Sequence, residues 1–481
     1  MSETARKIYF TRKSVVALIA AHGAEKDDAG LKRALGWVSL MALGIGGIIG
    51  AGIFVLTGTA AANYAGPGVM VSFILSGLAC AFVALCYAEL AALIPVSGSA
   101  YTYTYVTLGE IFAWIIGWNL VLEYAAGAAT VAVGWAGYFN RVMQGLGIGI
   151  PPQLTSAYFA SSGDSGAHGF FNVPAAGIVL LLTLLLVRGT SESTRFNNVI
   201  VALKVMVVLL VIAVGAAHIN AANWSPLIPE NSGEFGVYGW SGVARGASVV
   251  FFAYVGFDSV STAAQEAHTP QRDVPIGIVG SLIICTILYV AVAAVATGVV
   301  NYKELGVPDP MALVMDRTGV AGLAWVVKLG ALAGLTTAIL ALLYGQTRVF
   351  FTMAHDGLLP PIFAKLHHRY RTPAVSQILV GLIVALAAGL FPIDILGEMV
   401  SIGTLAAFAL VCVAVINLRK THPELPRPFR APGIPVMPIL GVLSCLALMI
   451  ALPLDTWLRL LIWTGVGLAI YAFYGINHAR R

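Results

Sequence analysis

Backbone groups are the first candidates for binding chemistry in this chain. Residues 44–54 read GIGGIIGAGIF inside an apolar run, and five of these eleven residues are glycine. Glycine destabilises a helix by about 1 kcal/mol relative to alanine, and unpaired backbone groups are costly in hydrocarbon. Such a segment is expected where an unwound membrane helix binds a ligand through its exposed N–H and C=O groups. Close helix packing through Gly46 and Gly50 is the alternative.

A second apolar segment carries a similar interruption. Residues 248–266 read SVVFFAYVGFDSVSTAAQE, which places Gly256 and Asp258 in the middle of a hydrophobic run. The interruptions lie in the first and sixth apolar segments, where two inverted repeats that each begin with a broken helix would place them. The glycine-rich segment has no preceding strand and no following Lys-Ser/Thr pair, which excludes phosphate and dinucleotide sites. We therefore expect no cofactor.

Lys204 is the clearest ionisable group within an apolar run, at the centre of VIVALKVMVVLL. A buried ammonium must find carbonyl or hydroxyl partners or lose its proton, because desolvation disfavours the charged form. Ionisable groups inside membranes are usually functional, so we expect Lys204 to act as a titrating switch. The alternative is a lysine that reaches a water-filled cavity for structural reasons alone.

Two carboxylates also fall within apolar runs. Glu123 can accept hydrogen bonds from the backbone of a broken helix or belong to a proton relay. Asp258 can cap the helix that begins after the second interruption and meet the positive end of its dipole. Arg245 and Lys328 lie nearer the ends of their runs, and we expect both side chains to reach the outer membrane surface.

Membrane helices are the elements that must position these residues. The chain has 481 residues, of which 59% are hydrophobic and 10% are charged, whereas soluble domains carry about 25% charged residues. A spanning helix needs about 20 mostly apolar residues, and twelve such stretches fill most of the sequence. The five cysteines lie inside them without metal or redox spacing, so we expect packing roles and no metal. The predicted spans are 36–60, 68–93, 111–139, 172–188, 196–217, 242–266, 275–300, 320–351, 374–391, 395–417, 434–452 and 456–475.

Charge in the connecting loops predicts the orientation. With the N-terminus inside, twenty Lys and Arg residues fall on the inner side and four on the outer side. This is the positive-inside bias, and it predicts a cell-membrane protein with both termini in the cytoplasm. The first apolar run is too long for a cleavable signal peptide. Residues 10–21 are amphipathic enough to lie on the inner membrane surface, and a disordered tail is the alternative.

The spans divide into repeats. We expect a cytoplasmic segment at 1–35, a first inverted repeat of five spans at 36–217, and a second at 242–417. Two further spans at 434–475 and a short cytoplasmic tail at 476–481 follow. The predicted fold class is an all-α integral membrane protein with twelve spans, discontinuous first and sixth helices, and a LeuT-like arrangement.

Several segments resemble the amino acid–polyamine–organocation transporters, and within them the shorter bacterial members of the cationic amino acid transporter family. The resemblance runs through the first ten predicted spans, with the motifs in the expected order. It rests on GIGGIIGAGIFVLTG (44–58), GSAYTYTY (98–105), FFAYVGFDSVSTAAQE (251–266), PQRDVPIGI (270–278), YGQTR (344–348) and DGLLP (356–360).

This resemblance implies how an amino acid is bound. Backbone at the first break would bind the α-carboxylate, and carbonyls at the second break would bind the α-amino group. The two breaks would thus hold a zwitterion without a charged side chain. Phe252 would also act as a gate above the substrate. The implied carboxylate ligands are Ile48, Ile49, Gly50, Ala51 and Gly52, and the implied amine ligands are Phe252, Ala253 and Val255.

The resemblance also implies proton coupling. Lys204 matches a lysine that, in proton-coupled members, occupies the place of a sodium ion in sodium-coupled relatives. Its implied partners are first-span carbonyls near Gly44 and the hydroxyl of Thr336 or Thr337. When charged, Lys204 would link the first and fifth spans, and deprotonation would release that link.

The implied side-chain pocket indicates a substrate class. Ala126, Phe252, Val255 and Leu342 would line it, and none of them is polar. Burying an unpaired guanidinium against Leu342 would be costly, so we predict a preference for small or medium neutral amino acids such as alanine. Transport of arginine, lysine or polyamines, with Glu123 as a partner, is the alternative, and a sensor that binds without transporting is another.

Other classes of protein fit less well. No HExxH motif or nucleophile elbow occurs, and His367 and His368 are adjacent in a basic loop, so we expect no enzyme. A pump driven by ATP would need a nucleotide motif and a soluble domain. A channel would need no paired broken helices. The expected partners are an amino acid, a proton and membrane lipid, with no nucleic acid.

Overall fold

A computed structural model describes residues 35–94, 99–160, 169–188, 194–368, 370 and 372–479. Helices dominate these residues, and the isolated pairing of Leu35 with Ala267 is their only β-bridge. The first half of the chain contains α3 (Trp37–Ile48), η1 (Gly52–Leu56), α4 (Thr57–Ala60), η2 (Ala61–Ala65), η3 (Gly66–Gly68), α5 (Val69–Leu93), α6 (Ser99–Thr107), α7 (Glu110–Gly145), η4 (Pro152–Leu154), α8 (Val173–Arg188), α9 (Thr194–Ala216) and η5 (Ala221–Trp224).

The second half of the chain is also mainly helical in its described residues. It contains α10 (Gly239–Val250), η6 (Phe251–Tyr254), α11 (Ser259–Thr262), η7 (Ala264–Glu266), α12 (Pro270–Val299), η8 (Tyr302–Leu305), α13 (Pro310–Arg317), α14 (Leu323–His355), η9 (Pro361–Ala364), α15 (Ala374–Leu390), α16 (Ile393–Thr421), α17 (Val436–Ile450), α18 (Leu454–Ile470), η10 (Tyr471–Gly475) and α19 (Ile476–His478).

Each predicted span overlaps at least one of these helices. Eight helical stretches among the described residues are long and apolar enough to cross a membrane, and α3, α8, α15 and α17 are shorter apolar helices. The all-helical membrane prediction is therefore confirmed, while the count of twelve crossings stays a prediction. Sequence reasoning did not predict α6 and α13, which lie between spans. The predicted surface helix at 10–21 lies outside the described residues, as do residues 480 and 481 of the predicted tail.

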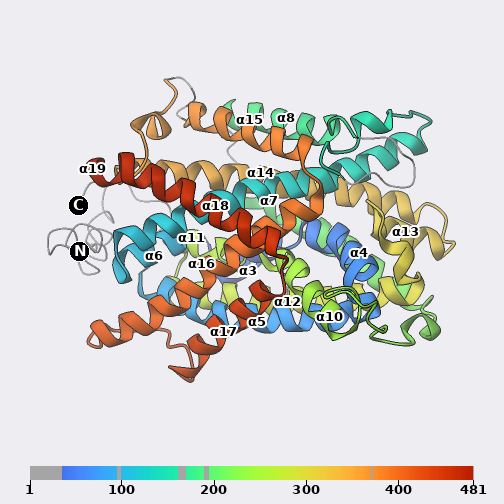
Figure 1. Ribbon diagram of the computed structural model, residues 1–481, viewed down its shortest axis with the longest axis horizontal. Coiled ribbons are helices and arrows are strands. Elements are labelled where there is room, and N and C mark those ends of the chain that lie inside the picture. Colours follow the sequence, from blue (N-terminus) through green and yellow to red (C-terminus); the bar gives the residue numbers. More distant parts are fainter. Residues whose placement is uncertain are drawn as a thin grey trace.

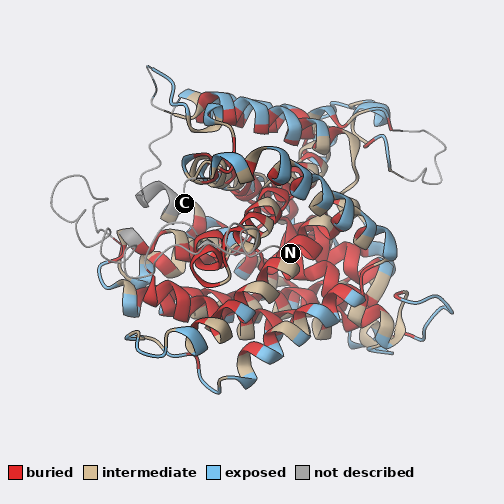
Figure 2. Cartoon of the chain, turned by 60° about the vertical axis from the view of Figure 1, so that its left-hand side comes forward, coloured by how far each residue is buried: buried red, intermediate tan, exposed pale blue. Residues whose placement is uncertain are grey.

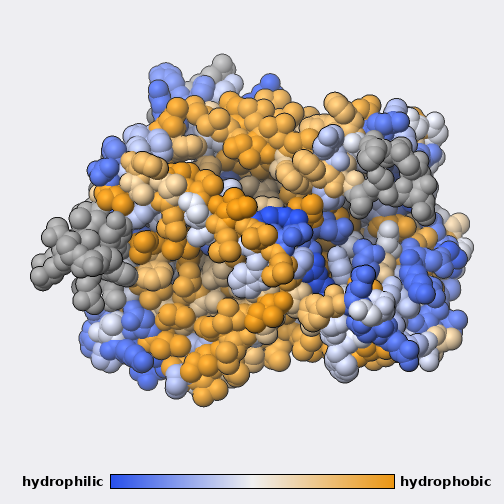
Figure 3. Space-filling view, viewed as in Figure 1, coloured by the Kyte–Doolittle hydropathy of each residue, from blue (hydrophilic) through white to orange (hydrophobic). Residues whose placement is uncertain are grey.

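The helices run roughly along the long axis of the molecule (Figure 1). α3, α11 and α12 lie near the centre, while α8 packs against α15 at one edge. Buried positions fill the interior of the bundle, and exposed positions line its peripheral helices (Figure 2). Hydrophobic residues cover much of the middle of the visible face, and hydrophilic residues gather toward its two ends and in one patch near the centre (Figure 3). This is the surface expected of helices that face lipid.

Both predicted interruptions are present. The first helix ends at Ile48, Ile49 is extended with φ −73° and ψ 101°, and a new helical segment begins near Ala51. In the second, η6 ends at Tyr254, and Val255 is extended with φ −60° and ψ 130°. Gly256 follows with φ +119°, a conformation that favours glycine. The two segments are therefore broken helices rather than continuous ones.

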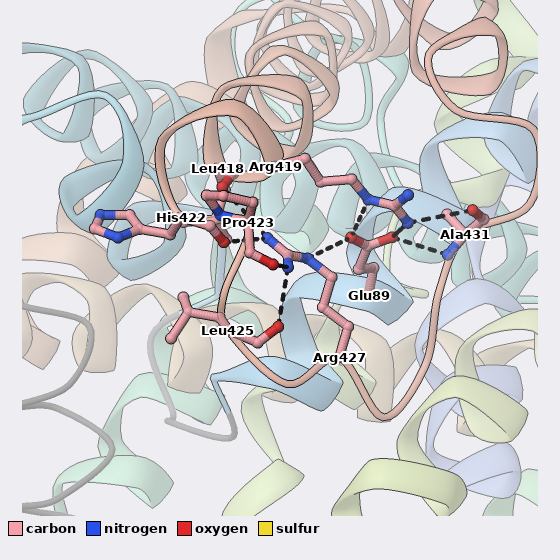
Figure 4. Close-up of polar contacts among 8 residues, drawn as sticks. All are labelled: Glu89, Leu418, Arg419, His422, Pro423, Leu425, Arg427 and Ala431. Atoms are coloured by element: carbon pink, nitrogen blue, oxygen red, sulfur yellow. Dashed lines mark hydrogen bonds and ion pairs between the residues drawn. The ribbon is translucent and has the colours of Figure 1, made fainter.

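The loop after α16 is tied to the end of α5 by a carboxylate (Figure 4). Both oxygens of Glu89 accept hydrogen bonds from Arg419, at 2.8 and 2.6 Å, and the backbone N–H of Ala431 donates at 2.8 Å. The guanidinium of Arg427 lies 3.5 Å from the same carboxylate. Because Glu89 is buried, this cluster fixes the loop against the helix ends.

Candidate functional site

The two breaks cross each other through glycines. A Cβ atom built on Gly256 would lie 2.6 Å from the carbonyl oxygen of Gly47, and one built on Gly47 would lie 3.0 Å from the oxygen of Gly256. A Cβ on Gly52 would overlap Ala253. Only glycine permits such close backbone approach. Sequence reasoning found the glycines, and the structure shows that three of them form the crossing.

Lys204 binds the end of the first half-helix. Its ammonium donates to the carbonyls of Gly46 at 3.1 Å and Ile49 at 3.2 Å. The last carbonyls of a helix have no partner within that helix, and they form the negative end of its dipole. The stem of Lys204 lies against Gly334 of α14, since a Cβ there would be 3.0 Å from its Cγ. Lys204 thus connects α9, α3 and α14.

Lys204 contacts first-span carbonyls two and five residues after Gly44, so the expected carbonyl partners near Gly44 are present. Lys204 contacts carbonyls of the last turn of α3, where the break frees them, whereas a Cβ on Gly44 would meet Ser281 and Val260. The predicted hydroxyl partners have other hydrogen bonds. Thr337 donates to the carbonyl of Gly334 at 2.9 Å. Thr336 donates to the carbonyl of Leu332 at 2.7 Å and accepts from Trp135 at 3.0 Å.

Tyr289 of α12 joins the two breaks, and sequence reasoning missed it. Its hydroxyl lies 2.7 Å from the carbonyl oxygen of Ile48 and 2.8 Å from that of Ala253. Both residues belong to the predicted ligand set. A phenol has one proton to donate, so the two carbonyls share one donor. A tyrosine in an apolar run gives no sequence signal for such a role.

The first residues after the break in the first span form a buried set of amides. The first four N–H groups of a helical segment have no partner within it, and a helix N-terminus attracts anions. Gly50, Ala51 and Gly52 occupy this position and are buried. A Cβ on Gly50 would lie 3.8 Å from Ala338 of α14, so space remains beside it. This arrangement can accept a carboxylate.

Carbonyls of the second break already have internal partners. Phe252 accepts from the N–H of Val255 at 3.1 Å, and Ala253 accepts from Tyr289. A carbonyl oxygen has two lone pairs, so both can still accept from an ammonium. All three residues are buried, with at most 9% of their surface exposed. The predicted amine ligands therefore lie together beside the first break.

The predicted cap by Asp258 was wrong. Asp258 occupies the N-cap position of α11, but its side chain makes no capping hydrogen bond. The reason is that the chain already turns helically at Asp258, with φ −66° and ψ −23°. The first amides then bond to preceding carbonyls, as Ser259 does to Gly256 at 3.1 Å and Ser261 to Asp258 at 2.8 Å. No first-turn amide is left for the carboxylate to cap.

Of the predicted pocket residues, Leu342 of α14 lies against α7 beside the position of Ala126. A Cβ on Gly127 would lie 3.5 Å from Leu342, and Ala126 is buried beside it with 6% exposure. One turn earlier, Glu123 is buried and adjoins Thr404 of α16. Among the described residues, its Oε2 has no hydrogen-bond partner. A polar group therefore lies near an otherwise apolar pocket.

Arg245 differs from its prediction. Instead of reaching the surface, its guanidinium is buried and pairs with Glu398 of α16. The carboxylate lies 153 residues away in sequence, which is why charge position alone suggested an exposed side chain.

Comparison with known proteins identifies the family of this chain. A model of the family described as Amino acid permease matches residues 35–477. The chain belongs to this family, which confirms the resemblance stated above. It is therefore a multi-pass membrane protein of a transporter family and not an enzyme.

Individual relatives carry different names. The branched-chain amino acid permease BcaP of Bacillus subtilis (strain 168) is 48% identical over 472 residues, which cover 98% of each chain. The methylthioribose transporter of the same organism is 46% identical over 468 residues, covering 97% of this chain and 98% of the relative. The chloroplastic cationic amino acid transporter 9 of Arabidopsis thaliana is 35% identical over 519 residues, covering 93% and 89%.

Proposed function

We propose that the protein is a proton-coupled secondary transporter that carries small or medium neutral amino acids by alternating access. The crossing of two broken helices is the observation that carries this proposal. It places the carbonyl end of one half-helix, the amide end of another and the carbonyls of the second break within one buried region. These opposite dipole ends match the two charges of a zwitterion.

The proposed topology has twelve spans. Spans 36–217 and 242–417 form two inverted repeats in a LeuT-like arrangement, spans 434–475 lie outside them, and both termini are cytoplasmic. The positions of the two breaks, one at the start of each repeat, support this division. The concentration of Lys and Arg in the N-terminal segment and in alternate loops supports the orientation, because such residues collect on the cytoplasmic side.

Lys204 is the proposed coupling residue. In its charged form it holds the carbonyls of Gly46 and Ile49, and so fixes α3 to α9 and α14. Loss of the proton removes the charge and so weakens the hydrogen bonds to these carbonyls, and α3 can then separate from α9. Proton release and movement of the first half-helix are thereby the same event.

The proposed substrate follows from the pocket. Ala126, Gly127 and Leu342 present apolar or small surfaces, which suit an aliphatic side chain, and the name of the branched-chain permease agrees with this class. Glu123 supports a second candidate, because its unpaired oxygen could bind the distal charge of arginine or lysine. The cationic amino acid transporter among the relatives agrees with that alternative.

A ligand screen followed by a flux measurement tests the proposal. Melting temperatures of the purified protein are measured with each of the twenty amino acids at two pH values, because a ligand that binds the folded state raises the melting temperature. Neutral aliphatic amino acids should give the largest shifts. Uptake of the best ligand into liposomes with an inward proton gradient then separates a transporter from a sensor. Arginine outcompeting alanine would refute the substrate class.

A further inference from the structure

A buried charge cluster connects the half-helix before the second break to the last span. Arg245 of α10 donates to Glu398 of α16 and, at 3.3 Å, to the carbonyl of Ala451. The other oxygen of Glu398 accepts from Thr456 of α18 at 2.6 Å and lies 3.6 Å from the guanidinium of Arg459. Glu398 therefore contacts two helices at once, one through each oxygen.

The half-helix α10 has a second attachment to the same region. Ser248, about one turn after Arg245, donates to the carbonyl of Leu448 in α17 at 2.6 Å. The guanidinium of Arg245 also lies over the ring of Tyr64, 5.4 Å from its centre. Because η6 follows α10 directly, these contacts act on the segment that ends at the break at Val255.

The last span is itself fixed to α7. The rings of Trp118 and Trp463 stack with centres 4.6 Å apart, and each indole N–H donates to the other residue's carbonyl, at 2.8 and 3.1 Å. Further along, Tyr471 donates to the buried carboxylate of Glu110 at 2.8 Å. A helix held this firmly provides a fixed point for Glu398.

We propose that Glu398 is a positioning residue for the binding site. It holds α10, and with it the second break, against a brace formed by α16 and α18. This inference rests on the proposed transport function, and it assigns a role to a helix outside the two repeats. When the site opens on the side where Arg245 lies, α10 must move away from the brace and the contacts of Glu398 must separate.

The charge pair favours two conformations, one with α10 against the brace and one with α10 fully separated from it, over intermediate ones. The side chains of Arg245 and Glu398 are 11% and 9% exposed, and separating such a pair without solvation leaves buried charges uncompensated. Partial separation is thus unfavourable, whereas full opening hydrates both groups. Weakening the pair should shift the protein toward the state open on this side, because a ligand or mutation shifts an equilibrium by its differential effect on the two states.

Thiol labelling measures that shift. The reporter is Val255→Cys at the break, and the five native cysteines are buried. Gly233→Cys, in the exposed loop before α10, marks the side on which Arg245 lies, because the neighbouring Gly236 packs against Arg245. A membrane-impermeant maleimide is applied to either side of the membrane in turn, and the rate of modification at the reporter is recorded.

Two variants and one control follow. Glu398→Gln should raise the labelling rate from the marked side by about tenfold, since hydrogen bonds to charged groups are the stronger ones. Thr456→Val keeps the ion pair between Arg245 and Glu398 and should raise the rate by about threefold, because it removes one of the hydrogen bonds that Glu398 accepts. Glu304→Gln, which breaks an exposed pair with Arg317, should leave it unchanged.

The outcomes separate the proposals. Rates that rise from the marked side alone support the brace. Unchanged rates in both variants, with an unchanged melting temperature, would overturn it, and so would equal rises from both sides, which indicate general loosening. If Glu398→Gln does not fold, the labelling rate of Thr456→Val alone tests the brace. Absence of amino acid uptake by the unmodified protein would refute the transport function. The labelling rates of the variants would still show whether Glu398 holds α10 against α16 and α18.

Discussion

Replacing Gly256 by alanine tests the crossing of the two broken helices. Gly256 has φ +119°, and holding a residue with a side chain in a sparsely populated region costs about 1–3 kcal/mol. The added Cβ would also lie 2.6 Å from the carbonyl oxygen of Gly47. That atom belongs to backbone, and overpacking of this kind costs a further ~1–3 kcal/mol. The crossed state should therefore lose about 2–6 kcal/mol.

A loss at the lower end of this range weakens binding about 30-fold if the substrate binds only the crossed state. The assay is the Kd of L-alanine for the purified protein, with the melting temperature measured in parallel. Gly233→Ala is the matched control, because Gly233 has φ +97° but nothing lies within 4 Å of an added Cβ. The control variant should have similar backbone strain from the positive φ but no steric overlap, and it should leave the Kd of L-alanine unchanged.

One result would refute the reasoning. If Gly256→Ala binds L-alanine within about threefold of the unmodified protein, a difference of less than 1 kcal/mol, then the crossing does not form the binding site.

Three further predictions concern single side chains. Lys204→Met should abolish uptake driven by a pH gradient and keep L-alanine binding, because the titratable link to the carbonyls of α3 is lost; full gradient-driven uptake would exclude the coupling role. Tyr289→Phe should raise the Kd of L-alanine by about threefold to tenfold, since two carbonyls lose their shared donor; an unchanged Kd would assign the hydroxyl to packing only. Glu89→Gln should destabilise the fold by about 3–5 kcal/mol by leaving two arginines uncompensated, while the exposed Glu304→Gln should cost less than about 1 kcal/mol; equal melting temperatures would contradict this.

Much of the fold could be predicted because its signals are local. Twenty apolar residues in a row make a membrane helix wherever they occur, and a glycine-rich or glycine–acid interruption weakens that helix at a definite place. For this reason each predicted span overlaps a helix, although several helices extend past the ends of their spans. Both breaks fall at Ile49 and Val255–Gly256, inside the predicted segments. Charge distribution and motifs likewise need no knowledge of packing.

The candidate site could be predicted in part. The sequence indicated which backbone segments are broken and that Lys204 is buried among them. It did not indicate that Lys204 selects the carbonyls of Gly46 and Ile49, nor that Asp258 makes no cap. Such partners depend on distances of a few tenths of an ångström between separate helices, which residue order does not specify.

The sequence by itself determined the class of protein, the positions of its long apolar helices and the location of the two breaks, because each depends on the residues within one segment. Only the tertiary structure decided that Tyr289 joins the breaks and that Arg245 is paired with Glu398 rather than exposed. Both contacts join helices that are distant in sequence. Their geometry is set by how the helices pack, and a hydrogen bond exists only where packing brings donor and acceptor together.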